Sequence, residues 1–106
     1  MDVTAEVKQR LEELWRSHLP LTLSRVEVLQ QAIEALPTGL PNELRIRARD
    51  EAHKLAGSLG TFDLTSASDC AARIERLFLQ ECAITPEQIA TIEEDFRHLK
   101  SAIEKR

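Results

Sequence analysis

Residues 42–62, NELRIRARDEAHKLAGSLGTF, are the stretch that decides how this chain folds. Its apolar residues recur every three or four positions, the spacing of one face of an α-helix, and they are Leu44, Ala48, Ala52, Leu55 and Leu59. With residues placed every 100° around a helix axis, His53 points about 150° away from the centre of that stripe. The stretch therefore predicts a helix that buries one face and presents His53 to solvent.

Two glycines stand on the His53 side of this expected helix. Gly57 follows one turn after the histidine and Gly60 two turns after it, with Ala56 beside them. A glycine inside a helix costs about 1 kcal/mol relative to alanine, so we interpret the pair as room left for a large partner to approach the ring. Three alternatives stay open: Gly60 as a helix C-cap, Gly57 as a close contact between helices, and His53 as an ordinary surface histidine.

The same helix has a local positive bias within an acidic protein, carried by Arg45, Arg47, Arg49 and Lys54. A charged helix face is usually only solvated. Arg49 lies one turn before His53, however, and Lys54 directly follows it, so both could attract an anionic group or an acidic surface. Ile46 falls on this side too, either as part of a docking patch or as a scattered surface residue.

Helical spacing continues along nearly the whole chain and is interrupted at proline and glycine. We expect five helical segments, over residues 4–18, 21–36, 42–59, 64–81 and from 86 onward. Leu19-Pro20 is expected to separate the first two segments. The last one begins with Thr85, Pro86 and Gln88, the pattern of a capping box with proline at the first helical position. Short connections favour antiparallel neighbours, which predicts an all-α, up-and-down four-helix bundle with an additional short N-terminal helix.

Composition excludes several classes of function. The 106 residues are 42% hydrophobic and 4% aromatic, with a net charge of −4, which suits a single helical domain over residues 1–106. An acidic balance disfavours nucleic acid and anionic membranes as partners. No membrane span or secretory segment is apparent, so we expect a cytoplasmic protein. Cys70 and Cys82 lack the spacing of a metal site and are interpreted as reduced thiols in or near the core.

The segment Ala52–Phe62, AHKLAGSLGTF, resembles the signature of histidine-containing phosphotransfer (HPt) domains of two-component phosphorelays. The similarity continues through Leu64, Cys70, Ala71, Ile74 and Glu75, and covers about a quarter of the chain. It implies a four-helix bundle in which an exposed His53 carries the phosphoryl group and Gly57 leaves room for a receiver domain. Two positions depart from the family pattern: Ala56 replaces a common lysine, and Asp63 replaces a common glycine at the bend.

Lys54 is expected to take over part of the missing lysine's electrostatic role, and Asp63 to be tolerated as a turn residue and N-cap. A hairpin turning near residues 62–64 would place His53 and Glu75, each eleven residues from Leu64, level on adjacent helices. Glu75 could then accept a hydrogen bond from Nδ1–H and leave Nε2 as the nucleophile. The alternative is that Glu75 pairs with Arg73, Arg76 or water.

These observations predict a phosphocarrier that takes a phosphoryl group on His53 from a receiver aspartate, or from a sensor kinase, and passes it to another receiver. The chain lacks a P-loop, so we expect no kinase or ATPase activity, no cofactor of its own, and Mg²⁺ supplied by the receiver. Response-regulator receivers, and a hybrid sensor kinase, are the expected partners of a monomer. The expected docking residues are Ile46, Arg49, Ala56, Gly57 and Gly60.

Two other functions are compatible with the sequence. In the first, the chain is a helical scaffold that binds partners through one face, and His53 is incidental. In the second, it is a metal-binding bundle, because Asp50 precedes His53 and Asp95 precedes His98 by three residues, as in carboxylate–histidine pairs. A di-iron bundle needs such pairs to face inward, whereas His53 is expected to face outward.

Overall fold

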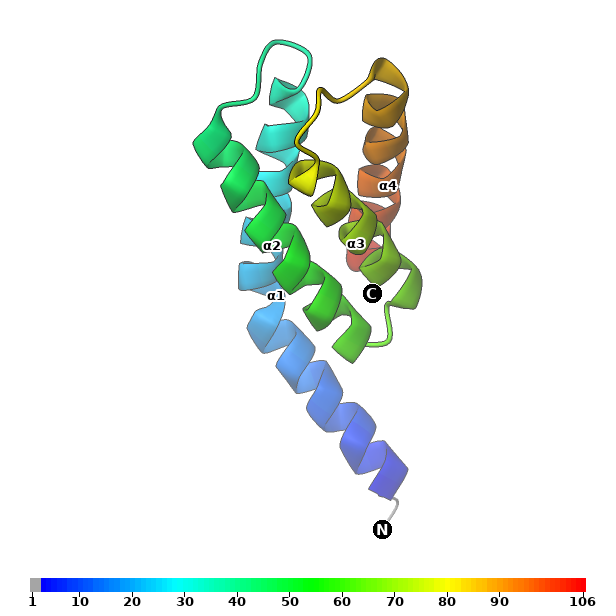
Figure 1. The fold of residues 1–106 in the computed structure, drawn as a ribbon. Coiled ribbons are helices and arrows are strands. Elements are labelled where there is room, and N and C mark those ends of the chain that lie inside the picture. The colour runs from blue at the N-terminus through cyan, green and yellow to red at the C-terminus, as the bar shows by residue number, and fades with distance from the viewer. Residues whose placement is uncertain (1–2) are drawn as a thin grey trace.

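The computed structural model describes residues 3–106, and within that range the helical segments form four α-helices and no strand. They are α1 (Val3–Ala35), α2 (Asn42–Thr61), α3 (Thr65–Leu79) and α4 (Pro86–Lys105). Helix α2 packs along α3, and α3 packs along α4 (Figure 1). Helix α1 packs mainly against α2 and also contacts α4. The chain is thus an all-helical domain, as the periodicity predicted.

The expected separate N-terminal helix does not exist, because the first two segments form the single helix α1 with Pro20 inside it. Proline removes one backbone hydrogen bond and bends a helix without necessarily ending it. Trp15 and Thr22, on either side of the proline, are both buried, so the same helix face is held before and after Pro20. Figure 1 shows the N-terminal half of α1 slanting away from its C-terminal half. Packing of this face against the bundle therefore keeps α1 continuous through Pro20, where the sequence predicted a break.

The other helix boundaries follow local signals. Gly39, at φ 120°, adopts a backbone conformation that favours glycine in the connection after α1. Thr85 Oγ1 accepts from the Gln88 backbone N–H at 3.1 Å, and Gln88 Oε1 accepts from the Thr85 N–H at 2.9 Å. The capping box predicted at the start of α4 is therefore confirmed.

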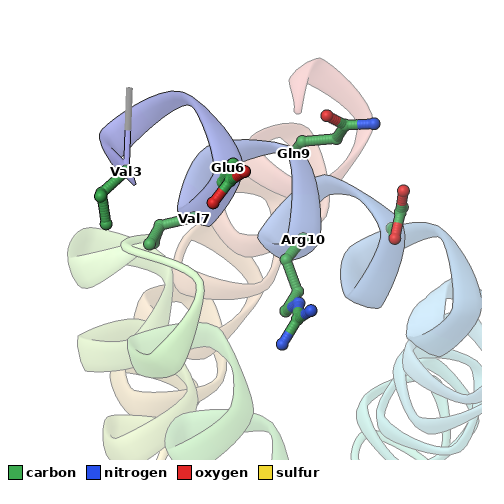
Figure 2. A pocket seen from close by; sticks show the side chains of 6 residues that line it. Val3, Glu6, Val7, Gln9 and Arg10 are labelled. Carbon is green, nitrogen blue, oxygen red and sulfur yellow. The ribbon is translucent and has the colours of Figure 1, made fainter. Parts of the chain in front are cut away.

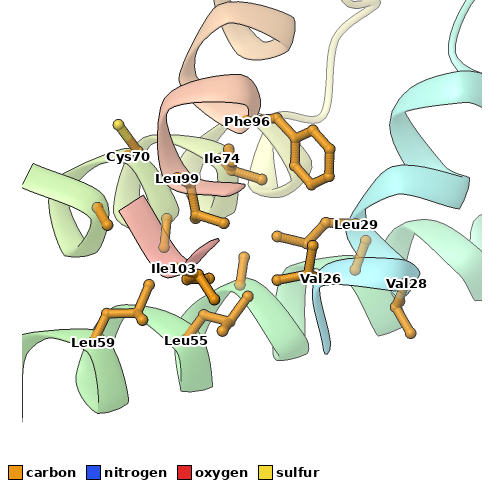
Figure 3. Close-up of a cluster of buried hydrophobic side chains, with 14 of the residues drawn as sticks. Val26, Val28, Leu29, Leu55, Leu59, Cys70, Ile74, Phe96, Leu99 and Ile103 are labelled. Carbon is orange, nitrogen blue, oxygen red and sulfur yellow. The ribbon is translucent and has the colours of Figure 1, made fainter. Parts of the chain in front are cut away.

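The hydrophobic core lies where the four helices meet, and each helix contributes to it (Figure 3). The apolar stripe predicted from residues 42–62 is largely buried, since Ala48, Ala52, Leu55 and Leu59 are all fully covered. Side chains from α1, α3 and α4 meet them, including Leu29, Ile74, Phe78 and Leu99. Burial of this face turns the opposite side of α2, with His53, toward solvent.

Candidate functional site

His53 lies on the exposed side of α2, and Glu75 on α3 holds its ring. The His53 side chain is 77% exposed and that of Glu75 is 20% exposed. Nδ1 of the ring lies 2.8 Å from Glu75 Oε1 and 3.0 Å from Oε2. Both carboxylate oxygens of Glu75 therefore contact Nδ1, and neither contacts the other ring nitrogen, Nε2. The level placement derived from the hairpin agrees with this contact, and the alternative pairing of Glu75 with Arg73 does not occur because Arg73 binds Asp95.

Two hydrogen bonds set how α2 and α3 lie beside each other. Near the start of α2, Arg45 Nη1 donates to the Phe78 carbonyl at 2.6 Å, close to the end of α3. Further along, Ser68 Oγ donates to the Ala56 carbonyl at 2.6 Å, close to the start of α3. The two helices therefore run in opposite directions, and the His53–Glu75 pair lies between these two fixed points. Arg45 is a structural residue rather than a free charge of the site.

The turn between α2 and α3 is a Schellman motif with an aspartate at its left-handed position. The Leu64 N–H donates to the Leu59 carbonyl at 2.9 Å, and the Asp63 N–H donates to the Gly60 carbonyl at 3.2 Å. Asp63 has φ 64°, the conformation for which glycine is usual. The expectation that Asp63 caps α3 is wrong, because Leu64 occupies that position without a side-chain cap. The C-cap interpretation of Gly60 is also wrong, because α2 extends through Thr61.

The surface of α2 carries no side chain at Gly57, one turn after His53. A Cβ atom built on Gly57 would meet no atom outside the local helix backbone within 4 Å, so this glycine is not required by packing between helices. At Gly60 an added Cβ would lie 3.4 Å from Ser68 Oγ, an ordinary contact. The open space at Gly57 leaves a smooth stretch of α2 one turn after the histidine, which a second molecule could approach closely.

The positive charges near His53 are mostly paired. Arg49 Nη2 lies 3.1 Å from Asp50 Oδ1. Lys54 Nζ lies 3.7 Å from Glu51 Oε1, and the Lys54 side chain is 55% exposed. Exposed pairs of this kind contribute about 0–1 kcal/mol. Lys54 can therefore leave Glu51 at little cost and turn toward an anion at the ring.

A shallow depression of about 270 Å³ adjoins the ring. It is lined by residues of α2 and α3, namely Arg49, Asp50, His53, Lys54, Glu75 and Leu79. Leu79 is 50% exposed. The sequence did not predict it as a site residue, because only the pairing of α2 with α3 brings it beside the histidine. Ile46, expected to be exposed, is half-buried. The depression is an open surface rather than an enclosed substrate pocket.

Neither cysteine lines the depression beside His53. Cys70 is buried, and Cys82 is exposed instead of lying near the core. Burial raises the pKa of the Cys70 thiol, and the nearby Asp95 carboxylate raises it further. A hydrogen bond from Arg73 to Asp95 raises the pKa of Arg73 in turn. In residues 3–106, no three His, Cys, Asp or Glu side chains gather as metal ligands.

The family model for the Hpt domain matches residues 24–104 of the sequence, which include all of the site described above. The chain belongs to the Hpt domain family. It is also 36% identical over 66 residues to Protein RcaC of Microchaete diplosiphon, a match that covers 61% of this chain and 10% of that protein. The chain thus spans about a tenth of that relative's length. A comparison with solved structures gave no significant match.

Family membership makes this Hpt domain a histidine-phosphotransfer module of phosphorelays, as the resemblance of residues 52–62 implied. The matched region begins within α1 and leaves out the N-terminal part of that helix. Across the described residues, none of the helices combines the length and apolarity needed to cross a bilayer.

Proposed function

We propose that His53 is the residue of this Hpt domain that is phosphorylated, by a receiver-domain aspartyl phosphate or a sensor kinase, and that passes the group to another receiver. One observation carries the proposal: a largely exposed ring has its Nδ1 held by a carboxylate on the adjacent helix. A surface histidine with no role needs no such partner, since an exposed pair contributes little stability.

Glu75 prepares the ring for nucleophilic attack. A carboxylate that accepts from Nδ1–H favours the tautomer with a lone pair on Nε2. In the transfer, Nε2 forms a bond to phosphorus while the bond from phosphorus to the aspartyl oxygen breaks, and the aspartate leaves as a carboxylate. No proton has to leave Nε2. The ring becomes positively charged when Nε2 is phosphorylated, and the negative charge of Glu75 stabilises that product.

The surroundings of the ring fit a protein partner. We propose that the receiver docks on the small residues Gly57, Gly60 and Ala56. Ile46 and Arg49 would lie at the edge of this docking surface. Lys54 supplies positive charge near the phosphoryl group, in place of the lysine that is absent at Ala56. Phosphoryl transfer depends on in-line positioning and charge neutralisation more than on covalent groups, so a flat, glycine-lined face is suited to it.

The remaining parts of the proposal concern what the partner and the cell supply. We propose that the receiver brings Mg²⁺ and its acidic pocket, and that the Hpt domain has no kinase or ATPase activity, in keeping with the absence of a P-loop from its sequence. The domain would act in the cytoplasm as an antiparallel up-and-down bundle. It would bind receivers or a hybrid sensor kinase, and neither nucleic acid nor membranes.

The test is transfer of labelled phosphate from a phosphorylated receiver to the purified chain. We expect label that survives base and is lost in acid, as for a phosphohistidine, and no label on the His53→Gln variant. His98→Gln is the matched control, because His98 is also an exposed histidine, on α4. The His98→Gln variant should accept label as the wild type does. Labelling of His53→Gln at the wild-type rate would refute the assignment.

A further inference from the structure

Helix α1 carries, from Val3 to Leu21, an apolar stripe that the bundle leaves largely uncovered. Figure 1 shows the N-terminal half of α1 projecting past the other helices, and the molecule is accordingly elongated, 56 × 22 × 20 Å. Every side chain from Val3 to Arg10 is exposed. The α1 stripe consists of Val3, Val7, Leu11, Leu14 and Leu21; Leu11 is half-buried and the other four are exposed, Val7 by 53% and Leu14 by 52%.

The spacing of the α1 stripe is that of a helix seam. Its members follow one another at intervals of four, four, three and seven residues, so they keep to one face of the helix over about 27 Å. The face that packs on the bundle, with Trp15 and Val26, lies to one side of this seam. Most helical stability in proteins comes from burying an apolar face, and a second helix laid along the stripe would bury this one.

The charges beside the stripe indicate which helix fits. Glu6, Arg10 and Glu13 line a shallow groove of about 430 Å³ together with Val3, Val7 and Gln9 (Figure 2). All of these residues belong to α1. If two copies of α1 cross antiparallel about a twofold axis between Leu11 and Glu12, Arg10 of each copy lies level with Glu13 of the other. A twofold axis matches a flank with itself, so both ion pairs form on the same side of the seam.

We propose that this chain forms an antiparallel homodimer through the α1 stripe. Leu11 then lies at the centre, Val7 and Leu14 interleave on either side of it, and the Arg10–Glu13 pairs fix the register. This replaces the monomer expected from the sequence. The stripe includes no residue of the His53 site, so the proposal is independent of phosphotransfer and is tested without it.

Sedimentation velocity between about 5 and 500 µM tests the dimer, because this range spans micromolar dissociation constants, as for a weak interface. The wild-type chain should approach twice the 12.0 kDa mass of one chain as its concentration rises. Val7→Glu with Leu14→Glu should remain at 12.0 kDa throughout. The matched control is Leu23→Glu, because Leu23 is 49% exposed on α1 but lies about 180° around the helix from the stripe.

Cysteine cross-linking tests the antiparallel direction in a Cys82→Ser background. Leu11→Cys should form a disulfide-linked dimer under mild oxidation, because the two copies meet near that residue. Val3→Cys should not, because an antiparallel pair holds its two copies about 26 Å apart. The proposal is overturned if the wild-type chain stays monomeric at every concentration, if Leu23→Glu dissociates it equally, or if Val3→Cys cross-links as well as Leu11→Cys.

Discussion

Replacing Gly57 by alanine should make the domain more stable and a worse phosphate acceptor. Alanine is favoured over glycine within a helix by about 0.5–1 kcal/mol. The new methyl group would meet nothing within 4 Å outside the local helix, so no clash offsets that gain. The midpoint of thermal unfolding should therefore rise by roughly 2–8 °C.

The same methyl group should hinder docking, because it projects from α2 one turn after His53. Overpacking a fitted contact typically costs about 1–3 kcal/mol, which corresponds to a roughly 5- to 150-fold loss in the rate constant for transfer. Leucine at the same position should transfer more slowly than alanine. The assay measures the second-order rate of labelling from a phosphorylated receiver, with urea unfolding on the same preparations.

Asp63→Gly separates stability from docking in this experiment. It should also stabilise the fold but lies ten residues beyond the histidine, at the turn. A Gly57→Ala variant that gains stability and transfers at the wild-type rate would refute the docking role of Gly57. A Gly57→Ala variant that loses stability would instead refute the open space around this residue.

Three further outcomes are expected. Glu75→Ala should slow phosphorylation of His53 more than Glu75→Gln does, because the amide oxygen of glutamine can still accept from Nδ1–H. The ¹⁵N chemical shifts of the ring report its tautomer, and equal populations of both tautomers in the wild type would contradict this role of Glu75. Asp63→Gly should raise the free energy of unfolding by about 0.5–1 kcal/mol, since φ 64° is strained for a residue with a Cβ; unchanged urea unfolding would count against that strain. Cys82 should react with a thiol reagent at pH 8 well before Cys70, whose burial and raised pKa leave little thiolate; equal rates would contradict the burial of Cys70.

The helices of the site were predictable because their signals are local. The apolar stripe of residues 42–62 follows from periodicity alone, and so does the outward direction of His53. The capping box at Thr85 joins residues only three apart. Placing His53 level with Glu75 needed one further step, the assumption of a hairpin near residue 63, and the 2.8 Å contact agrees with it.

Other features depended on contacts between distant segments. Pro20 ended a helix by local rules, but buried residues before and after it keep α1 continuous. Asp63 was expected to act as an N-cap, yet the turn required a left-handed residue at that point. Arg45 was expected only to add to the positive bias of its helix, whereas its side chain binds the end of α3.

The amino-acid sequence by itself determined the helical class, the family and the histidine that faces solvent, since each depends on neighbours within a turn or two. The tertiary structure alone decided that Leu79 adjoins the ring, that Gly57 faces open space and that the first half of α1 extends past the bundle with its stripe largely uncovered. These features depend on which helices pack together and where that packing ends, and periodicity along one segment carries no information about either.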